Sequence, residues 1–441
     1  MTSVTPEMTI DLDRDLLRSN VLAETLLAHV KTQPLLVLAL ALQLPFKPNA
    51  TQFVASRLAV DPASLLYDMA LLTRLAQKAA QGEAAHATST LPRPWLEAII
   101  AHLPGLDGHA PATAAPVSNS HASPASGFGC QQPTWQELTW QDMASQAFKA
   151  LRPHQWAKNI LVFVPVILAH RAGDPHAIMA ALLAFVCFSL AASGMYLLND
   201  MMDLAQDRKH PAKRNRPFAS GRLPVSAGFF MLPACLAGAI GLATLLPDGF
   251  MVVLGLYGVL NLAYTFYLKS KLLVDVLALA GAYTLRILGG ERALDIDMSF
   301  WLLAFSTFMF LSLALVKRYV ELDTVEDETG NGKNRVMGRG YRKGDLDMLS
   351  QLGVASGFSA VLVLALYVDG AGRLGLYKTP EFIWLVCPIV LYVIGRIWVL
   401  AKRRELPDDP VLFIIRDWRS HLMGLIVIAV MITAKTVGYT F

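Results

Sequence analysis

The sequence predicts an all-α membrane protein with nine transmembrane helices in one bundle, preceded by a small soluble domain. Of its 441 residues, 54% are hydrophobic and only 16% are charged, whereas ordinary soluble domains carry about 25% charged residues. The mean hydropathy is +0.44. Nine apolar runs follow one another in the later two thirds of the chain, and apolar runs of this length should be helices, because backbone polar groups cannot stay unpaired in lipid.

Charge and cysteine content exclude other classes. The 38 basic and 34 acidic residues leave a net charge of only +4, which gives no indication of nucleic-acid binding. The four cysteines lie far apart, so neither a disulfide framework nor a metal site is expected. They are Cys130, Cys187, Cys235 and Cys387.

The chain is expected to have three parts. Residues 1–103 have soluble composition and read as mostly helical, and no signal peptide is expected because the start is polar and acidic. Within them, the apolar run 35–46 is shorter than the roughly 20 residues of a spanning helix, so we expect it to be buried or interfacial. Residues 104–140 are rich in Ala, Pro, Ser and Gly and predict a linker. Residues 141–441 form the transmembrane domain.

Basic residues predict how the helices are oriented. The nine apolar runs lie near 158–170, 177–198, 226–246, 250–267, 273–289, 298–316, 350–368, 382–400 and 420–438. The loops after the second, fourth, sixth and eighth runs hold twenty Lys and Arg residues, and the opposite loops hold four. The positive-inside rule places the N-terminus and these four loops in the cytoplasm. We therefore expect a multi-pass protein of the cell inner (plasma) membrane.

The end of the second run is acidic. Asn199, Asp200, Asp203 and Asp207 follow its last apolar residues, and on one helix the three carboxylates would fall within an arc of about 60°. Hard oxygen ligands of this kind suit Mg²⁺ together with substrate phosphates. Three basic residues then follow within reach of a bound phosphate, Lys213, Arg214 and Arg216. An ordinary solvated helix end would explain the basic residues but not the three acids, so we expect a magnesium–diphosphate site.

This stretch resembles the first motif of the UbiA-type polyprenyl transferase superfamily, Asn-Asp-x-x-Asp-x-x-x-Asp. The Arg-Pro-x-x-x-Gly tail of that motif is present as Arg216, Pro217 and Gly221. The resemblance covers about residues 150–441. It implies a nine-helix bundle with a central cavity open to lipid at the side, and cytoplasmic acidic motifs that hold a Mg²⁺-bound diphosphate.

The second half of the domain is similar to the decaprenyl-phosphate phosphoribosyltransferase branch of this superfamily. Enzymes acting on aromatic acceptors often carry a second Asp-x-x-x-Asp, but Leu279 stands four residues after Asp275, so a second clamp of that type is not expected. Four segments match motifs of the branch: Arg152, Pro153, Gln155, Trp156, Lys158 and Asn159; Tyr264, Thr265, Leu268, Lys269 and Asp275; Arg286 and Gly290; and Lys317, Arg318, Tyr319 and Glu321.

The resemblance implies transfer of 5-phosphoribosyl from phosphoribosyl pyrophosphate to polyprenyl (decaprenyl) phosphate. The alternative is prenyl transfer from a polyprenyl diphosphate to an aromatic or porphyrin-like acceptor. Either reaction needs Mg²⁺ to neutralise the leaving diphosphate, and the ribosyl reaction needs extra cations for its phosphates. Asp275 joins the three acids as a catalytic candidate, with Tyr264 lining the cavity. The other candidate substrate-binding residues are Lys158, Lys269, Arg286, Lys317 and Arg318. The sequence leaves the oligomeric state open.

The N-terminal segment resembles the start of haloacid-dehalogenase-type phosphatases. Asp11 and Asp13 match their Asp-x-Asp motif, but Arg14 and Asp15 replace the following Gly and Thr. We expect a degenerate remnant without phosphatase activity, and an ordinary polar helix start is the alternative.

Overall fold

The computed structural model describes residues 9–81, 85–103, 106–107, 139–210, 213–296, 299–324, 340–373, 379–407 and 409–436. Nearly all of the expected linker 104–140 lies outside this described part. The chain forms two compact units. Unit 1 comprises residues 1–152 and 196–234, and unit 2 comprises 153–195 and 235–441.

Unit 1 contains a small parallel sheet that the sequence analysis did not predict. Its strand order is β1-β2-β3, and Ile10 pairs with Ala87. The strands are too short for an alternating pattern to be recognisable. Their bounds are β1 Thr9–Asp11, β2 Ala85–Thr88 and β3 Leu106–Asp107. The helices of unit 1 are α1 Val21–Val30, α2 Pro34–Gln43, α3 Ala50–Ala55, α4 Met69–Ala80, α5 Arg93–His102, α6 Trp140–Ala150 and α9 Leu204–Lys209.

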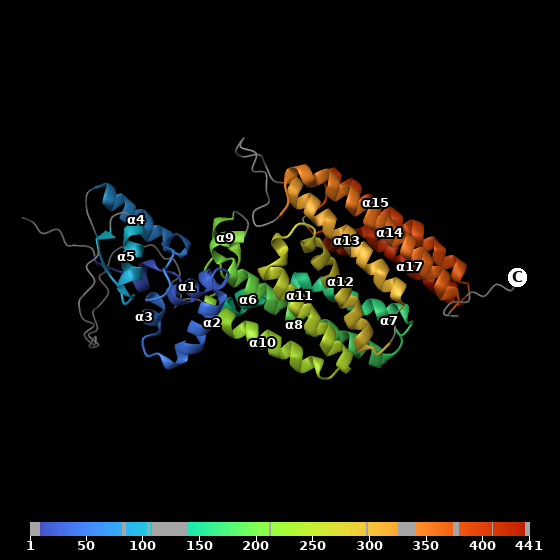
Figure 1. Ribbon diagram of the computed structural model, residues 1–441, viewed down its shortest axis with the longest axis horizontal. Helices are drawn as coiled ribbons and strands as arrows, with labels where there is room; N and C mark the ends of the chain where they lie inside the picture. The colour runs from blue at the N-terminus through green and yellow to red at the C-terminus, as the bar shows by residue number, and fades with distance from the viewer. Residues whose placement is uncertain are drawn as a thin grey trace, which may run out of the picture. The chain divides into compact units, whose positions relative to one another are not determined.

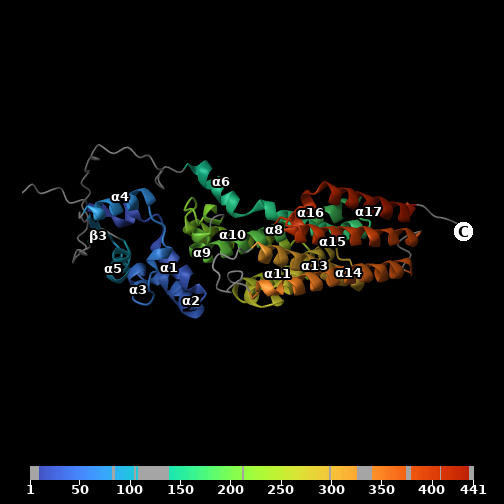
Figure 2. The ribbon, with the colours of Figure 1, turned by 90° about the horizontal axis from the view of Figure 1, so that it is seen from above.

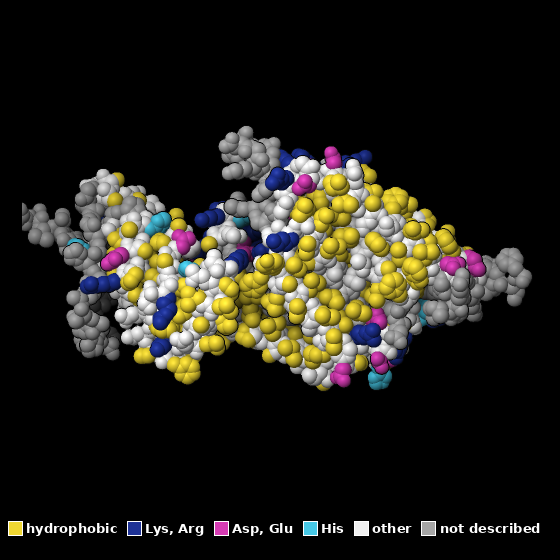
Figure 3. All heavy atoms as spheres, viewed as in Figure 1, with side chains coloured by type: hydrophobic (Ala, Val, Ile, Leu, Met, Phe, Trp, Pro, Cys, Tyr) yellow, Lys and Arg dark blue, Asp and Glu magenta, His cyan; other side chains and the backbone are white. Residues whose placement is uncertain are grey.

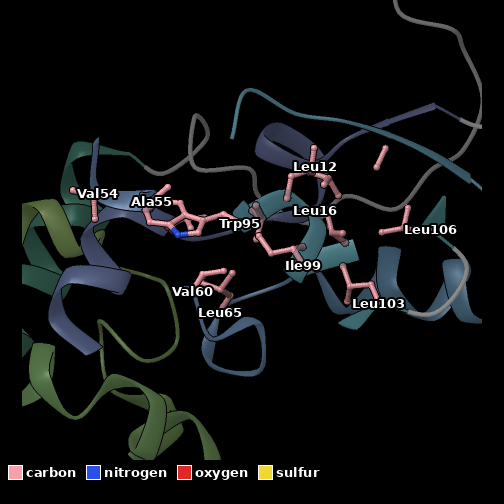
Figure 4. Packing of buried hydrophobic residues seen from close by; sticks show 14 of the residues in the cluster. Leu12, Leu16, Val54, Ala55, Val60, Leu65, Trp95, Ile99, Leu103 and Leu106 are labelled. Carbon is pink, nitrogen blue, oxygen red and sulfur yellow. The ribbon is translucent and has the colours of Figure 1, made fainter. Parts of the chain in front are cut away.

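The core of unit 1 lies around α5 and the turn after β1 (Figure 4). Leu12, Leu16 and Ile99 are fully buried there, and Trp95 fills the space toward Val54 and Ala55. The Trp95 indole N–H donates to the Leu58 carbonyl over 2.9 Å, so burying this ring leaves no polar atom unpaired.

Unit 2 is a helical bundle (Figures 1 and 2). A 3-10 segment, Pro153–Phe163, leads into it, and two long helices, α8 and α10, contribute residues to both units. The bounds are α7 Val164–Leu168, α8 Pro175–Met202, α10 Val225–Ala243, α11 Asp248–Phe266, α12 Val274–Ala293, α13 Phe300–Asp323, α14 Leu346–Arg373, α15 Val386–Lys402, α16 Pro410–Arg416 and α17 Trp418–Thr436.

Seven helices in the described part of the chain are long and apolar enough to cross a membrane: α8, α10, α11, α13, α14, α15 and α17. Apolar side chains cover much of the surface of unit 2 on the face drawn in Figure 3. The protein is therefore a multi-pass membrane protein. The expected count of nine spans is not confirmed. The run 158–170 forms the 3-10 segment and the short α7, and α12 carries Asp275, Arg286 and Glu291 within its 20 residues.

Gly290 explains how α12 meets the 3-10 segment. A Cβ atom at Gly290 would lie 2.1 Å from the Val162 carbonyl oxygen, so only glycine allows the two backbones to approach this closely. This contact brings Arg286, one turn earlier on α12, within reach of Asn159.

Candidate active site

The acidic end of α8 is interrupted. Helix α8 ends at Met202, Asp203 has non-helical dihedrals (φ −102°, ψ 12°), and α9 begins at Leu204. The expectation that one continuous helix carries all three carboxylates on one face is therefore wrong at Asp203. Its carboxylate forms an ion pair with Lys31, which caps the end of α1.

Arg216 links the other two carboxylates. Its Nη1 lies 3.1 Å from Asp200 Oδ1 and 2.6 Å from Asp207 Oδ2. Arg152 also donates to Asp200 Oδ1. Asp200 is only 2% exposed, yet its Oδ2 accepts no hydrogen bond within the described part of the chain. A buried carboxylate oxygen without a donor is costly, so this atom is open to a cation. Arg152, Asp200, Asp203, Asp207 and Arg216 are called the acidic cluster below.

The acidic cluster has the ligand chemistry of a magnesium site, but it is not assembled around one point. Among the described residues, no three His, Cys, Asp or Glu side chains gather closely enough to hold a metal ion. The acids are carboxylates, the ligands that Mg²⁺ prefers, and Asp200 offers an unfilled oxygen. The oxygen ligands of the cluster therefore fit Mg²⁺ in kind. In this structure, arginine and lysine side chains contact the same carboxylates.

The remaining residues of this stretch lie around the cluster. Asn199 is half-buried on the last turn of α8, and its carbonyl accepts from the Asp203 N–H over 2.9 Å. Lys213 and Arg214 are exposed on a short 3-10 turn. The tail of the motif ends at Gly221, whose φ of 73° favours glycine over any other residue.

The segment 152–159 binds one face of α8. In unit 2, the Trp156 indole donates to Ser193 Oγ over 3.0 Å, and Asn159 donates to Ser189 Oγ over 3.0 Å. Ser189 and Ser193 are one turn apart on the helix. Trp156 and Asn159 therefore provide hydrogen-bond donors for two serine hydroxyl groups that are buried in an apolar helix.

A second polar cluster lies in unit 2 around Asp275, which is fully buried in the first turn of α12. Arg318 from α13 and the Tyr341 hydroxyl both donate to its carboxylate. Arg318 also contacts Glu321 and donates to the Tyr264 hydroxyl over 2.9 Å. Burial and the Asp275 charge raise the pKa of Tyr341, which keeps its hydroxyl protonated as a donor. These five residues are called the Asp275 cluster.

Lys158 and Lys317 are both held by one acid that the sequence analysis did not single out. Asp409 accepts from Lys158 and lies 3.9 Å from the Lys317 ammonium. Its other oxygen accepts from the Val411 and Leu412 N–H groups at the start of α16. Burial raises the pKa of Asp409, but the charges of the two lysines and these hydrogen bonds outweigh it and lower the pKa below its usual value.

Arg286 belongs to a different network from Asp275, although both are on α12. Its Nε donates to Asn159 Oδ1 over 2.7 Å, and its Nη2 donates to the Tyr257 hydroxyl over 2.9 Å. The guanidinium also lies 4.9 Å from the centre of the Tyr257 ring. Lys269, another predicted substrate-binding residue, is half-buried on the 3-10 turn Leu268–Ser270. The structure thus brings Asp275, Arg318 and Tyr264 together and places Arg286 apart.

Unit 2 contains an apolar cavity of about 280 Å³. Its wall comes from the 3-10 segment and from α7, α12, α13, α14, α15, α17 and the turn before α15, and it includes Leu161, Phe305, Met309, Tyr367, Val390 and Met431. Such a wall offers burial to an apolar group and little hydrogen bonding.

Sequence reasoning missed Asp409 and Tyr341. The pair Asp409-Pro410 is a readable signal for a helix start, since Asp caps α16 and Pro occupies its first position. Nothing local indicates that the same carboxylate meets Lys158, which is 251 residues away. Tyr341 lies at the edge of a segment outside the described residues and carries no motif of its own.

In unit 1, Asp11 and Asp13 are both engaged locally. Asp11 Oδ1 accepts from the Asp13 N–H over 3.0 Å, and caps the turn that follows β1. Asp13 accepts from the Ser89 hydroxyl over 2.9 Å and from the Thr90 N–H over 2.6 Å. The two acids therefore lie at the end of β1 beside the segment that follows β2.

The helical bundle of unit 2 thus combines several long apolar helices with buried carboxylate–cation pairs and an apolar cavity. Residues 160–418 match the model of the UbiA prenyltransferase family. The chain belongs to the UbiA prenyltransferase family and is a transferase, as the motif around Asp200 predicted.

Three relatives are informative. The Uncharacterized protein y4nM of Sinorhizobium fredii is 38% identical over 285 residues, which are 64% of this chain and 55% of that protein. The Nodulation protein NoeC of Azorhizobium caulinodans is 36% identical over 62% of this chain and 87% of that protein. The Decaprenyl-phosphate phosphoribosyltransferase of Corynebacterium glutamicum is 38% identical over 193 residues, 43% of this chain and 58% of that protein. The chain thus spans little more than half of the first and third relatives.

Solved structures support the fold. A UbiA homolog from Archaeoglobus fulgidus, bound to GPP and Mg²⁺, aligns with 66% of this chain and all of its own, with a TM-score of 0.51 and 14% identity. At this identity the likeness concerns the fold alone.

Proposed function

We propose that the protein transfers a 5-phosphoribosyl group from phosphoribosyl pyrophosphate to a polyprenyl phosphate such as decaprenyl phosphate. The single observation that carries the proposal is the set of Lys and Arg side chains around two acids of unit 2, Asp275 and Asp409. Lys158, Lys317 and Arg318 come from two separate segments and are each held by a carboxylate. A reaction whose donor and acceptor both carry phosphates needs such cations, and an aromatic acceptor does not. The relatives named as decaprenyl-phosphate phosphoribosyltransferases support the same substrates.

The acidic cluster is the proposed donor site. Asp200 and Asp207, with Asp203, would hold Mg²⁺, which when bound supplies charge neutralisation for the leaving diphosphate. Arg216 lies between two of these carboxylates, so it would turn to the diphosphate as the ion takes its place. Lys213 and Arg214 are exposed and basic, and they would steady the diphosphate from the same loop.

The bond changes of the proposed step balance. The bond between the anomeric carbon and the diphosphate oxygen breaks, and the diphosphate departs with the electron pair. An oxygen of the lipid phosphate then bonds to the anomeric carbon, which carries oxocarbenium character. Preformed donors that meet developing charge supply most of the rate enhancement in such reactions.

The cations of unit 2 are the proposed acceptor side. Lys158 and Lys317, joined by Asp409, carry one positive charge in excess and would bind the lipid phosphate or the ribose 5-phosphate. Asp275 would act by fixing Arg318, since its carboxylate already accepts from Arg318 and Tyr341. Lys269 and Tyr264 would contact the phosphate side of the substrates. Arg286 donates to Asn159 and Tyr257 and would form part of the wall of the proposed acceptor site.

The apolar cavity of unit 2 is the proposed place for part of the isoprenoid chain. A volume of about 280 Å³ suits a few isoprene units rather than a whole polyprenyl chain, so the remainder would extend into lipid. Burial of apolar area at about 25 cal/mol per Å² would supply the binding free energy.

A transfer assay with purified protein tests the proposal. Radiolabelled phosphoribosyl pyrophosphate, decaprenyl phosphate and Mg²⁺ should give a labelled lipid, and EDTA should abolish it. No labelled lipid, together with turnover of a polyprenyl diphosphate with an aromatic or porphyrin-like acceptor, would reject the ribosyl proposal in favour of prenyl transfer. Asp203→Ala with full activity would reject the metal role of that residue.

We further propose that residues 1–103 derive from a haloacid-dehalogenase-type domain without phosphatase activity. Asp11 ends a parallel strand, and Asp13 follows it and accepts from Ser89, an arrangement consistent with that origin. Hydrolysis of p-nitrophenyl phosphate that disappears in Asp11→Asn would contradict the inactive assignment.

We also propose an inner-membrane location with the N-terminus in the cytoplasm. Labelling of single cysteines placed in the loops, in intact and in permeabilised cells, tests the orientation.

A further inference from the structure

Helix α2 is apolar on all sides. Its sequence, Pro-Leu-Leu-Val-Leu-Ala-Leu-Ala-Leu-Gln, contains a single polar side chain. One face packs into the core of unit 1, where Val37 and Leu40 are buried and Leu36 and Leu44 contact the same cluster. A helix that is apolar all round is normally buried on every side, so the opposite face requires an explanation.

That opposite face is exposed within the described part of the protein. Leu35, Leu38 and Leu42 are 81%, 57% and 66% exposed, and Phe46 just after the helix is 83% exposed. The three leucines stand at positions i, i+3 and i+7, which form one stripe of a helix. Apolar side chains are visible at the surface where α2 lies (compare Figures 1 and 3). These four residues are called the outer face of α2.

The chain around α2 is tied to the end of a membrane-spanning helix, within unit 1. Lys31, three residues before α2, forms an ion pair with Asp203, which directly follows α8. On α1, Glu24 accepts from both terminal nitrogens of Arg208 over 2.7 and 2.8 Å. Helix α8 ends at Met202 and is long enough to span a bilayer, so α1 and α2 are tied to residues that directly follow the end of a membrane-spanning helix.

The stretch of sequence that contains the outer face carries basic residues and no acidic ones. The sequence contains no Asp or Glu between Glu24 and Asp61, whereas Lys31, Lys47 and Arg57 lie in the same stretch. Lys31, before α2, is paired with Asp203, whereas Lys47 directly follows Phe46 at the other end of the apolar stripe. Basic residues that flank an apolar helix face are typical of helices that bind anionic lipid headgroups.

We propose that the outer face of α2 is a monotopic membrane anchor, in which Leu35, Leu38, Leu42 and Phe46 enter the boundary between headgroups and acyl chains. An interfacial helix of this kind sinks by about 5–10 Å. At ten residues, α2 is about 15 Å long and cannot span the bilayer. Lys47 at its C-terminal end contacts anionic headgroups, and the buried face of α2 keeps unit 1 attached. This proposal is independent of the reaction proposed above.

Fluorescence of the full-length chain in proteoliposomes tests the anchor. Leu38→Cys is labelled with the environment-sensitive dye NBD in a background where the four native cysteines are replaced by alanine. Gln77→Cys on α4, an exposed position of the same unit, is the matched control. Vesicles contain equal parts of phosphatidylethanolamine and phosphatidylglycerol, with or without lipids that carry a doxyl quencher near the headgroup.

The label at position 38 should emit at shorter wavelength than the label at position 77, and doxyl lipid should quench it severalfold more strongly. Equal emission and quenching at the two positions would overturn the proposal. A label at position 38 that is shielded but not quenched would also overturn it. In that case a second copy covers the face if dilution restores exposure, and another segment of the chain covers it if dilution does not. Both labelled proteins must elute as single peaks and melt at the temperature of the unlabelled parent.

Discussion

The acidic cluster of unit 1 and the Asp275 cluster of unit 2 pair carboxylates with arginines in opposite ways. In the acidic cluster, Asp200 and Asp207 share the partly exposed Arg216, and one buried oxygen of Asp200 has no donor in the described structure. In the Asp275 cluster, one buried acid is matched by one buried Arg318, and Tyr341 donates to the remaining oxygen. The first arrangement leaves one carboxylate oxygen without a hydrogen-bond donor in the described structure, whereas both oxygens of Asp275 accept hydrogen bonds from side chains.

Backbone geometry sharpens the same contrast. Each cluster has a non-glycine residue with positive φ at its edge, Arg152 at 54° and Leu273 at 62°. Such conformations cost about 1–3 kcal/mol each and persist only where neighbouring structure holds them. At Arg152 the side chain itself reaches Asp200, whereas at Leu273 the backbone N–H donates to Tyr341 over 3.0 Å. Backbone geometry therefore positions a side chain in one cluster and a hydrogen-bond donor in the other.

The largest loss of stability is expected when the arginine of the Asp275 cluster is removed. Arg318→Met leaves the buried carboxylate of Asp275 without its ionic partner, which should lower the free energy of unfolding by about 3–5 kcal/mol. Thermal unfolding in detergent measures it. The double variant Asp275→Leu/Arg318→Met should be less destabilised than Arg318→Met, because no buried charge is then left alone. A change below about 1 kcal/mol for Arg318→Met would show that the two clusters are alike.

The acidic cluster should respond in activity rather than in stability. Asp200→Asn removes the proposed cation ligand and should lower transferase activity by about 10²–10³-fold, the scale of losing one preformed electrostatic contact to a transition state. Its melting temperature should change much less than that of Arg318→Met. Asp248→Asn, at the exposed start of α11, is the matched control and should keep full activity. Unchanged activity in Asp200→Asn would remove this residue from the metal site.

Asp409 lies outside both clusters and should show its role through pH. Its pKa is lowered in the folded protein, so the carboxylate stabilises the fold above its usual pKa of about 4. That contribution disappears as the pH falls through the folded value. Thermal stability of the parent should therefore drop below about pH 4 by an amount that Asp409→Asn lacks, of about 1–2 kcal/mol. Parallel pH profiles for the parent and the variant would contradict the bridge between Lys158 and Lys317.

The smallest effect is expected at the exposed edge of the acidic cluster. Lys31→Ala removes the ion pair with Asp203, whose side chains are both partly exposed. Pairs of this kind contribute about 0–1 kcal/mol, and rising salt should reduce even that difference. A loss of stability as large as that of Arg318→Met in the same melting experiment would show that the Lys31–Asp203 pair contributes as much as a buried ion pair.

Hydropathy and one acidic motif were enough to predict the helical membrane class, the transferase assignment and the family, because both are local features of the chain. The number of spans was harder, since Asp275, Arg286 and Glu291 make α12 less apolar than its neighbours. The interruption at Asp203 was not predicted, because helical periodicity places residues only while the helix continues. The strands of unit 1 were missed for a related reason, since two to four residues show no period.

The geometry of the candidate site depends on tertiary contacts, which are not visible in the sequence. Candidate cations could be selected because basic residues stand in motifs, and Lys158, Lys317 and Arg318 are all buried or half-buried beside carboxylates. Their partners could not be predicted, because the choice between Asp409, Glu321 and Asp275 is made by helix packing. Asp275 and Arg286 illustrate this, since they share a helix but Arg286 donates to Asn159 whereas Asp275 accepts from Arg318.

The bridge from Lys158 to Asp409 also has a consequence for biosynthesis. The two residues are 251 positions apart, and a membrane protein is made from its N-terminus onward. Lys158 and Lys317 are therefore in place long before the ribosome reaches their shared counter-ion. Until then, Lys158 and Lys317 must stay hydrated or pair with other groups, because an unpaired charge is costly to bury. Chains that stop before Asp409 would contain six of the seven long apolar helices of the described structure and would still lack the acid that pairs with Lys158 and Lys317.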